Sequence, residues 1–200
     1  MTPPERSPDR DAAIAAMLPL VPLTGWTVRT LTDAAGRDAD LLFSSNSADM
    51  VEAYIDWADR QMEQEASLIG LEVLRLPERV RAVIALRLQQ ARPHKEAVRR
   101  AMGVLALPGN AAIAARTAAR TVDAIWHAAG DTSADFSWYT KRAILLGVYG
   151  TTLLYWLRDD SDEDERTLAF LDRRLAGVGR IGKLRRRVDD ALSRFRPAAA

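Results

Sequence analysis

Residues 47–66, SADMVEAYIDWADRQMEQEA, carry the clearest secondary-structure signal in the chain. Four of their apolar residues recur at every fourth position: Met50, Tyr54, Ala58 and Met62. That spacing is typical of one face of an α-helix, and Ser47 is a residue type that caps helix N-termini. Four carboxylates leave the rest of the helix surface acidic: Glu52, Asp56, Asp59 and Glu63. The stretch therefore predicts a long amphipathic helix with one buried stripe.

The composition extends this prediction to the whole chain. It has 200 residues and no cysteine, so it is long enough to bury a core and forms no disulfide. Lys and Arg number 28 against 27 Asp and Glu, and a net charge of +1 argues against bulk nucleic-acid binding. Two histidines and no thiol leave few options for a transition-metal site. Because no segment alternates convincingly as a strand, we expect an all-α fold.

Helix starts and stops divide the chain into four parts. Helices are predicted at 9–18, 27–35, 47–66, from 77, from 93, and at 111–129, 137–157, 162–176 and 183–195. Asn110 and Ser161 are expected to cap the helices that follow them. We predict a tail at 1–8, a helix-turn-helix-like unit at 9–66, a helical ligand-binding domain at 67–178, and a glycine hinge with a terminal helix at 179–200.

The N-terminal unit resembles the helix-turn-helix domain of TetR-type regulators, with short helices and the Gly25-Trp26 turn ahead of a long helix. DNA binding needs basic residues to meet the phosphates. Residues 1–60 instead hold five Arg and ten Asp or Glu, and the would-be recognition stretch 36–43 offers one arginine against two aspartates. We therefore predict that the unit is structural and binds no nucleic acid.

The second feature is the uncharged segment 143–157, which is too short to span a membrane. A helix that is apolar all round is either the core helix or the wall of an apolar pocket. Gly147 and Gly150 would let another helix or a ligand chain approach closely. The residues alone favour the core helix, while a pocket lined this way would hold a lipid-like ligand.

The third feature is the basic C-terminal arm, in which residues 180–200 hold seven Lys or Arg and two Asp. Apolar residues fall on one face with arginine beside them: Leu184, Val188, Leu192 and Phe195, with Arg185. This pattern fits an anionic membrane surface, and it equally fits docking on the protein's own domain or on a second subunit.

No catalytic constellation is complete. Asp160, Asp162 and Asp164 begin like a calcium-binding loop, but Glu165 replaces the required glycine and Leu171 the closing glutamate. The two histidines are isolated, and no phosphate loop or nucleophile elbow occurs. We expect no catalytic residue, no metal site and no cofactor.

A long motif then points to a family. The segment GDTSADFSWYTKR at 130–142 strongly resembles the ubiquinone (coenzyme Q) biosynthesis accessory proteins numbered nine in the Coq series, including bacterial homologues. Further matching pieces extend the resemblance over most of residues 10–178: 25–26, 49–53, 57–60, 93–100, 160–162 and 167–175.

The resemblance implies a TetR-like fold that has lost DNA binding and a non-catalytic protein that carries isoprenoid quinone intermediates. It implies docking on the di-iron demethoxyubiquinone hydroxylase through Trp138, Tyr139 and Arg142, near Asp131. Trp, Tyr and Arg are also the residue types enriched at interface hot spots, although the residues alone favour Trp138 as a cap of the core. The family's C-terminal amphipathic helix meets the membrane.

On this basis we predict a lipid-binding accessory protein. The expected lipid-contacting residues are Leu145, Leu146, Val148, Tyr149, Thr152, Leu153 and Trp156. The expected membrane-contacting residues are Leu184, Arg185, Val188, Leu192 and Phe195. We expect a homodimer in the cytoplasm, associated peripherally with the inner membrane. The alternative is a TetR-type ligand-responsive transcriptional regulator, and a quinone-modifying enzyme is third.

Overall fold

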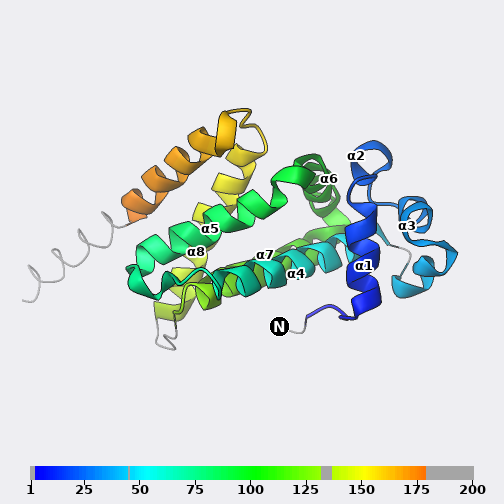
Figure 1. Ribbon diagram of the computed structural model, residues 1–200, viewed down its shortest axis with the longest axis horizontal. Helices are drawn as coiled ribbons and strands as arrows, with labels where there is room; N and C mark the ends of the chain where they lie inside the picture. Colours follow the sequence, from blue (N-terminus) through cyan, green and yellow to red (C-terminus); the bar gives the residue numbers. More distant parts are fainter. Residues whose placement is uncertain (1–2, 45, 132–136, 179–200) are drawn as a thin grey trace, which may run out of the picture.

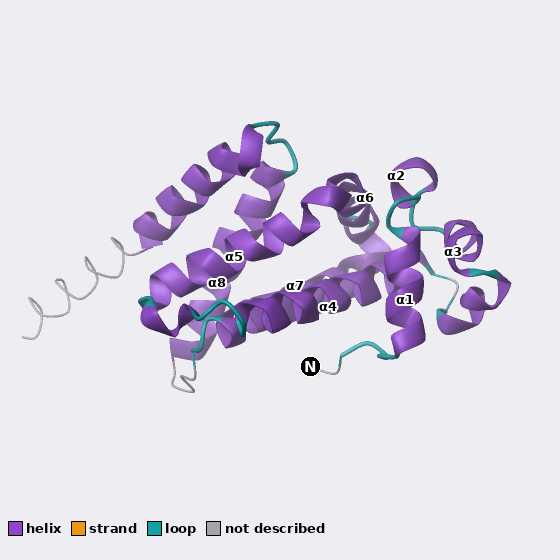
Figure 2. Ribbon diagram, viewed as in Figure 1, coloured by secondary structure: helices purple, strands orange, loops and turns teal. Residues whose placement is uncertain are grey.

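The computed structural model describes residues 3–44, 46–131 and 137–178, and within this part every regular element is a helix. The α-helices are α1 (Pro8–Met17), α2 (Val21–Thr24), α3 (Val28–Ala35), α4 (Ser47–Ala66), α5 (Leu76–Ala91), α6 (Lys95–Leu105), α7 (Ala111–Ala128), α8 (Ser137–Trp156) and a further helix over 165–178. The predicted all-α fold is confirmed, and the predicted helices within this part begin and end within a few residues of the observed ones (Figure 2).

The N-terminal unit sits at one end of the molecule, where α1 packs on α3 and on the start of α4 (Figure 1). Trp26 is buried, and its Nε1 donates to the carbonyl of Ala97 in α6 at 3.0 Å. The would-be recognition stretch forms only a 3₁₀ helix, Arg37–Leu42, which carries Asp38 and Asp40 in its first turn. The unit is therefore tied to the rest of the bundle as a structural element.

The long helices α4 and α7 lie side by side along the molecule, with α5, α6 and α8 around them (Figure 1). The apolar stripe of α4 is buried as predicted, and all four of its residues belong to one continuous core: Met50, Tyr54, Ala58 and Met62. In α7, Val122 and Ile125 are also in that core. Burial of these faces is what orders the bundle, since isolated helices of this length are marginal in water.

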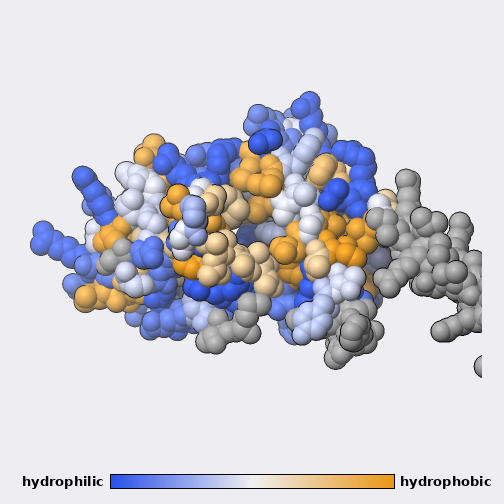
Figure 3. Space-filling view, turned by 180° about the vertical axis from the view of Figure 1, so that it is seen from behind, coloured by the Kyte–Doolittle hydropathy of each residue, from blue (hydrophilic) through white to orange (hydrophobic). Residues whose placement is uncertain are grey.

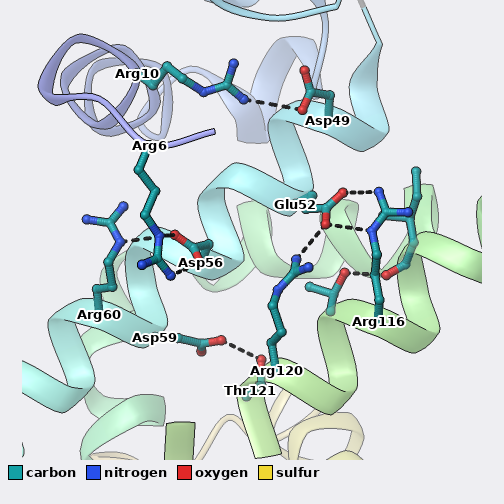
Figure 4. Close-up of polar contacts among 12 residues, drawn as sticks. Arg6, Arg10, Asp49, Glu52, Asp56, Asp59, Arg60, Arg116, Arg120 and Thr121 are labelled. Atoms are coloured by element: carbon teal, nitrogen blue, oxygen red, sulfur yellow. Dashed lines mark hydrogen bonds and ion pairs between the residues drawn. The ribbon is translucent and has the colours of Figure 1, made fainter. Parts of the chain in front are cut away.

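The acidic face expected on α4 is wrong as an outer surface, because three of its carboxylates are buried (Figure 4). Each is paired with a cation from elsewhere in the chain. Glu52 accepts hydrogen bonds from Arg116 and from Arg120 of α7, the latter at 2.6 Å. Asp56 accepts from Arg6 at 2.7 Å and from Arg60 at 3.1 Å. Asp59 accepts from Arg87 of α5 at 3.1 Å and from Thr121 of α7 at 2.7 Å. Buried charges require such partners, so these pairs fix how α4 sits against its neighbours.

One of the three predicted caps is wrong, and the other two residues stand at helix starts. Asn46 caps α4 in place of Ser47, because its side chain accepts from the amide of Ala48 at 2.9 Å. Asn110 is the N-cap residue of α7 as predicted, but its side chain makes no capping hydrogen bond, and its Nδ2 donates to the carbonyl of Val104 at the end of α6. Ser161 does accept from the amide of Arg166 at 3.2 Å, at the start of the helix over 165–178.

In the described part of the chain, no helix has the length and apolarity needed to cross a membrane. The predicted C-terminal helix at 183–195 and its five membrane-contacting residues lie outside the described residues.

Candidate functional site

A cavity of about 570 Å³ lies between α5, α6, α7 and α8, with Tyr54 and Ile55 of α4 on its wall. Most of its lining is aliphatic, from residues such as Leu88, Val98, Met102, Leu105, Ala114 and Ala118. Figure 3 shows apolar side chains gathered around a hollow on this side of the molecule. The volume and the lining are those of a pocket for an apolar or amphiphilic small molecule.

Helix α8 contributes one face to this cavity and the opposite face to the core. Of the seven predicted lipid-contacting residues, Leu146, Tyr149 and Leu153 line the cavity. The other four are buried and are not among the lining residues that the structure describes: Leu145, Val148, Thr152 and Trp156. The two alternatives for this segment, core helix and pocket wall, are therefore both present, on different faces.

Gly147 and Gly150 widen the cavity. Both line it, and a Cβ built on either glycine meets no heavy atom within 4 Å. No neighbouring helix fills the space that the missing side chains leave, and at the exposed Gly147 this space is open to solvent.

The cavity opens beside α8. Leu146 and Leu154 both line it and are 42% and 59% exposed. Ile144, on the same helix, is also exposed. Exposed aliphatic residues around an opening are typical of a site that receives an apolar guest or a partner.

One wall of the cavity is polar. Arg87 is only 6% exposed, and its Nε donates to the buried carboxylate of Asp59. Burial alone would lower the pKa of Arg87, but the attraction of its partners, Asp59 among them, outweighs burial and raises that pKa. Burial raises the pKa of Asp59, against the opposing effect of Arg87 and Thr121. Tyr149 is 9% exposed, and burial raises its pKa to about 12, so its hydroxyl keeps its proton at neutral pH.

Sequence reasoning missed this polar wall and the contributions of α5 and α6. One signal was present: Arg87 interrupts the apolar run between Ile84 and Leu88, on the side of α5 that faces inward. Its partner Asp59 is 28 residues away, so no local spacing connects the two.

The predicted partner-docking residues lie around the start of α8. Tyr139 is 76% exposed, whereas Arg142 donates its Nε to Asp123 of α7 and is largely covered. Lys141 Nζ lies 3.8 Å from a carboxylate oxygen of Asp131, which joins that residue to the same turn. Trp138 belongs to α8, but its side chain lies outside the described part of the structure.

Over the residues that the structure describes, no group of three His, Asp or Glu side chains is placed to hold a metal ion. The geometry of the cavity thus supports binding of an apolar molecule, with polar contacts at one wall.

Comparison with solved structures places the fold. A TetR transcriptional regulator from Nitrosomonas europaea ATCC 19718 superposes with a TM-score of 0.69 at 23% identity, covering 85% of this chain and 97% of that one. At this identity the likeness concerns the fold alone, and it confirms the predicted TetR-like architecture.

Comparison of sequences points to one family. Residues 111–182 match the COQ9 family model. The ubiquinone biosynthesis protein COQ9, mitochondrial, of Rattus norvegicus is 31% identical over 187 residues, and its Homo sapiens counterpart is 30% identical, each over 88% of this chain. The chain spans about 60% of the length of these relatives. The matching family model and the similarity along most of its length thus make this chain similar to the COQ9 proteins.

Proposed function

We propose that this chain acts in ubiquinone biosynthesis as a non-catalytic lipid-binding accessory protein that holds an isoprenoid quinone intermediate in the cavity. The observation that carries the proposal is the apolar cavity of about 570 Å³, open beside α8. The names of the COQ9 relatives supply the pathway, and the aliphatic lining supplies the chemistry of the guest.

Burial of the guest's tail supplies the binding energy. Each buried CH₂ contributes about 0.8 kcal/mol, so a prenyl tail in the cavity offsets much of the cost of leaving a bilayer. The apolar residues around the opening, Leu146 and Leu154, give a tail a route that avoids water.

In this proposal, the hydroxylation itself is carried out by a partner enzyme. We propose that the docking patch of Asp131, Trp138, Tyr139 and Arg142 presents the loaded protein to the demethoxyubiquinone hydroxylase. The exposed ring of Tyr139 supports this assignment, because a large aromatic side chain in water is a common anchor of a protein interface.

DNA binding is the weaker assignment for this chain. Its would-be recognition stretch is a 3₁₀ helix with Asp38 and Asp40 in its first turn, and these charges repel phosphate. The TetR-like neighbour contributes the fold and no function.

The deciding experiment is mass spectrometry of lipids that co-purify with the intact chain. We expect isoprenoid lipid with the wild type and several-fold less with Gly150→Leu, whose side chain projects into the cavity. Gly103→Leu is the matched control, because Gly103 is also a helical glycine with open space but does not line the cavity. Equal lipid content in all three proteins, or none above an unrelated control protein, would refute the carrier role.

Membrane association is proposed from the sequence of the C-terminal arm. Deleting residues 183–200 is expected to abolish flotation with anionic liposomes at low salt, because near such a surface each cation contributes about 1 kcal/mol. Unchanged flotation of the truncated protein would remove this role.

A further inference from the structure

The polar wall of the cavity is formed by three buried side chains. Arg87 of α5, Tyr149 of α8 and Tyr54 of α4 all line the cavity and are all buried. The pair with Asp59 accounts for the charge of Arg87, and Tyr54 packs with Trp26 and Trp57 and interacts with Arg87. Neither contact accounts for the Tyr149 hydroxyl. In ligand pockets, a few fixed polar groups in an apolar lining orient the guest.

The charge at this wall is balanced. The guanidinium of Arg87 faces one carboxylate, that of Asp59, at 3.1 Å, and Asp59 takes its further hydrogen bond from the neutral Thr121. An anionic head group placed here would add a buried charge with no counter-ion of its own, which is costly. The wall therefore suits a neutral head group.

The Tyr149 hydroxyl supplies a donor. Tyr149 as a residue is 9% exposed and lines the cavity, and no hydrogen bond joins its hydroxyl to another residue that the structure describes. A buried hydroxyl is stabilised when it finds an acceptor, and the cavity is the direction from which an acceptor can come. Carbonyl, ether and hydroxyl oxygens all meet this need.

The exposed lining residues Leu146 and Leu154 mark the opening, and the buried lining residues Arg87, Tyr54 and Tyr149 do not contribute to it. The rest of the lining is mostly aliphatic residues of α5, α6 and α7, together with Gly147 and Gly150. The cavity is thus polar at its buried wall and apolar toward its mouth.

We propose that Arg87, Tyr54 and Tyr149 form a polar subsite for a neutral, oxygen-bearing head group, so that the guest lies head first with its apolar chain toward the opening beside α8. This inference rests on the proposed lipid-binding function and adds to it the orientation of the guest and the residues that select its head.

The test uses the full chain and three probes that share a ten-carbon tail: decylubiquinone, decylbenzene without ring oxygens, and anionic decyl phosphate. Each probe is delivered from cyclodextrin, and the bound fraction is measured by liquid chromatography after equilibrium dialysis. Tyr149→Phe removes only the hydroxyl. Tyr155→Phe is the matched control, because Tyr155 is on the same helix but stacks on Phe170, with ring centroids 4.6 Å apart, and does not line the cavity.

We expect Tyr149→Phe to weaken decylubiquinone binding about tenfold, the effect of one buried hydrogen bond, and to leave decylbenzene binding unchanged. Tyr155→Phe is expected to match the wild type with every probe. Arg87→Lys keeps a charge opposite Asp59 but loses the planar guanidinium, so it too is expected to weaken binding of the quinone alone.

Three outcomes separate this inference from the proposed function. If the wild type binds both neutral probes and Tyr149→Phe changes neither, the polar subsite is refuted while the lipid cavity stands. If decyl phosphate binds more tightly than decylubiquinone, the neutral head group is refuted. If the wild type binds no probe, the proposed function fails, and this inference fails with it.

Discussion

At the scale of single residues, the pair of Asp59 and Arg87 has the largest expected effect on stability, because both side chains are buried. Arg87→Met leaves the carboxylate of Asp59 without its cation. We expect the free energy of unfolding to fall by about 3–5 kcal/mol, measured by urea denaturation at pH 7. The double variant Asp59→Leu/Arg87→Met is expected to regain most of the loss, since no lone charge then remains in the core.

The stability loss of Arg87→Met is also expected to depend on pH. Burial raises the pKa of Asp59 and Arg87 opposes that rise, so removing Arg87 raises the pKa further. Because a protonated Asp59 is neutral, the deficit of Arg87→Met is expected to shrink as the pH is lowered from 8 to 5. A deficit below about 1 kcal/mol that does not vary with pH would show that water reaches the pair.

Tyr139 offers a clean test of partner docking at the residue scale. Because its ring is mostly exposed, Tyr139→Ala is expected to change stability by less than about 0.5 kcal/mol while weakening co-purification of the hydroxylase. Leu23→Ala in α2 is the control, an equally exposed apolar residue in the N-terminal unit. Equal co-purification with both variants would contradict a role for Tyr139. Arg142→Ala is less informative, because it also removes the bond to Asp123.

At the scale of elements, α8 contains two glycines that line the cavity, Gly147 and Gly150, and each lowers the stability of the helix relative to alanine. A Cβ at Gly147 or Gly150 meets no atom within 4 Å, so Gly→Ala at each site is expected to stabilise the protein by up to about 1 kcal/mol. The measurement is the midpoint of thermal unfolding. Gly130→Ala is the opposite case, since Gly130 has φ +73° and its Cβ would lie 2.9 Å from Arg79 Nη1. Destabilisation by the α8 alanines would instead mean that something packs on these glycines in solution.

The elements themselves could be predicted from the sequence, while their outer faces could not. The period of Met50, Tyr54, Ala58 and Met62 is local, and a local signal is enough to place α4 and its buried stripe. The partners of its carboxylates are not local. Arg6 bonds to Asp56 across 50 residues and Arg116 to Glu52 across 64, so no spacing along the chain shows that these charges are buried.

The candidate site was predictable only in part, for the same reason. The apolar segment of α8 identified one wall, but a helix that is apolar all round gives no period to separate Leu146, at the cavity, from Leu145, in the core. The other walls come from α5, α6 and α7, whose apolar faces have the pattern of ordinary core helices. A cavity depends on how several helices pack together, so no sequence pattern within one helix predicts it.

At the scale of the whole molecule, buried carboxylates of α4 join the N-terminal segment to the bundle. Glu52 is bonded to Arg116 and Arg120 of α7, and Asp56 is bonded to Arg6, which precedes α1. Burial alone would raise the pKa of both carboxyls, but the hydrogen bonds from these arginines outweigh it, and both pKa values lie below their ordinary values of 4.5 and 3.8.

The lowered pKa values of Glu52 and Asp56 affect how the stability of the fold changes in acid. A carboxyl whose pKa is lower in the folded state than in the unfolded state stabilises the fold above its ordinary pKa, and that stabilisation is lost as the pH falls through the lowered value. Asp59 and Glu63, whose pKa values are raised by burial, act in the opposite direction. Asp159, whose carboxylate accepts from Thr167 and Ser161, has a lowered pKa and adds to the loss in acid.

We therefore expect the thermal midpoint to hold from pH 7 to about pH 5 and to fall steeply below about pH 4.5, where the carboxyls with lowered pKa values become protonated. Glu52→Gln is the matched variant. It is expected to be less stable than the wild type at pH 7, because Arg116 and Arg120 lose their counter-ion, and to lose less stability between pH 5 and pH 3, because residue 52 no longer titrates. Parallel pH profiles for the two proteins would show that the pair of arginines does not hold Glu52 ionised, and that this ion pair does not stabilise the packing of α4 on α7.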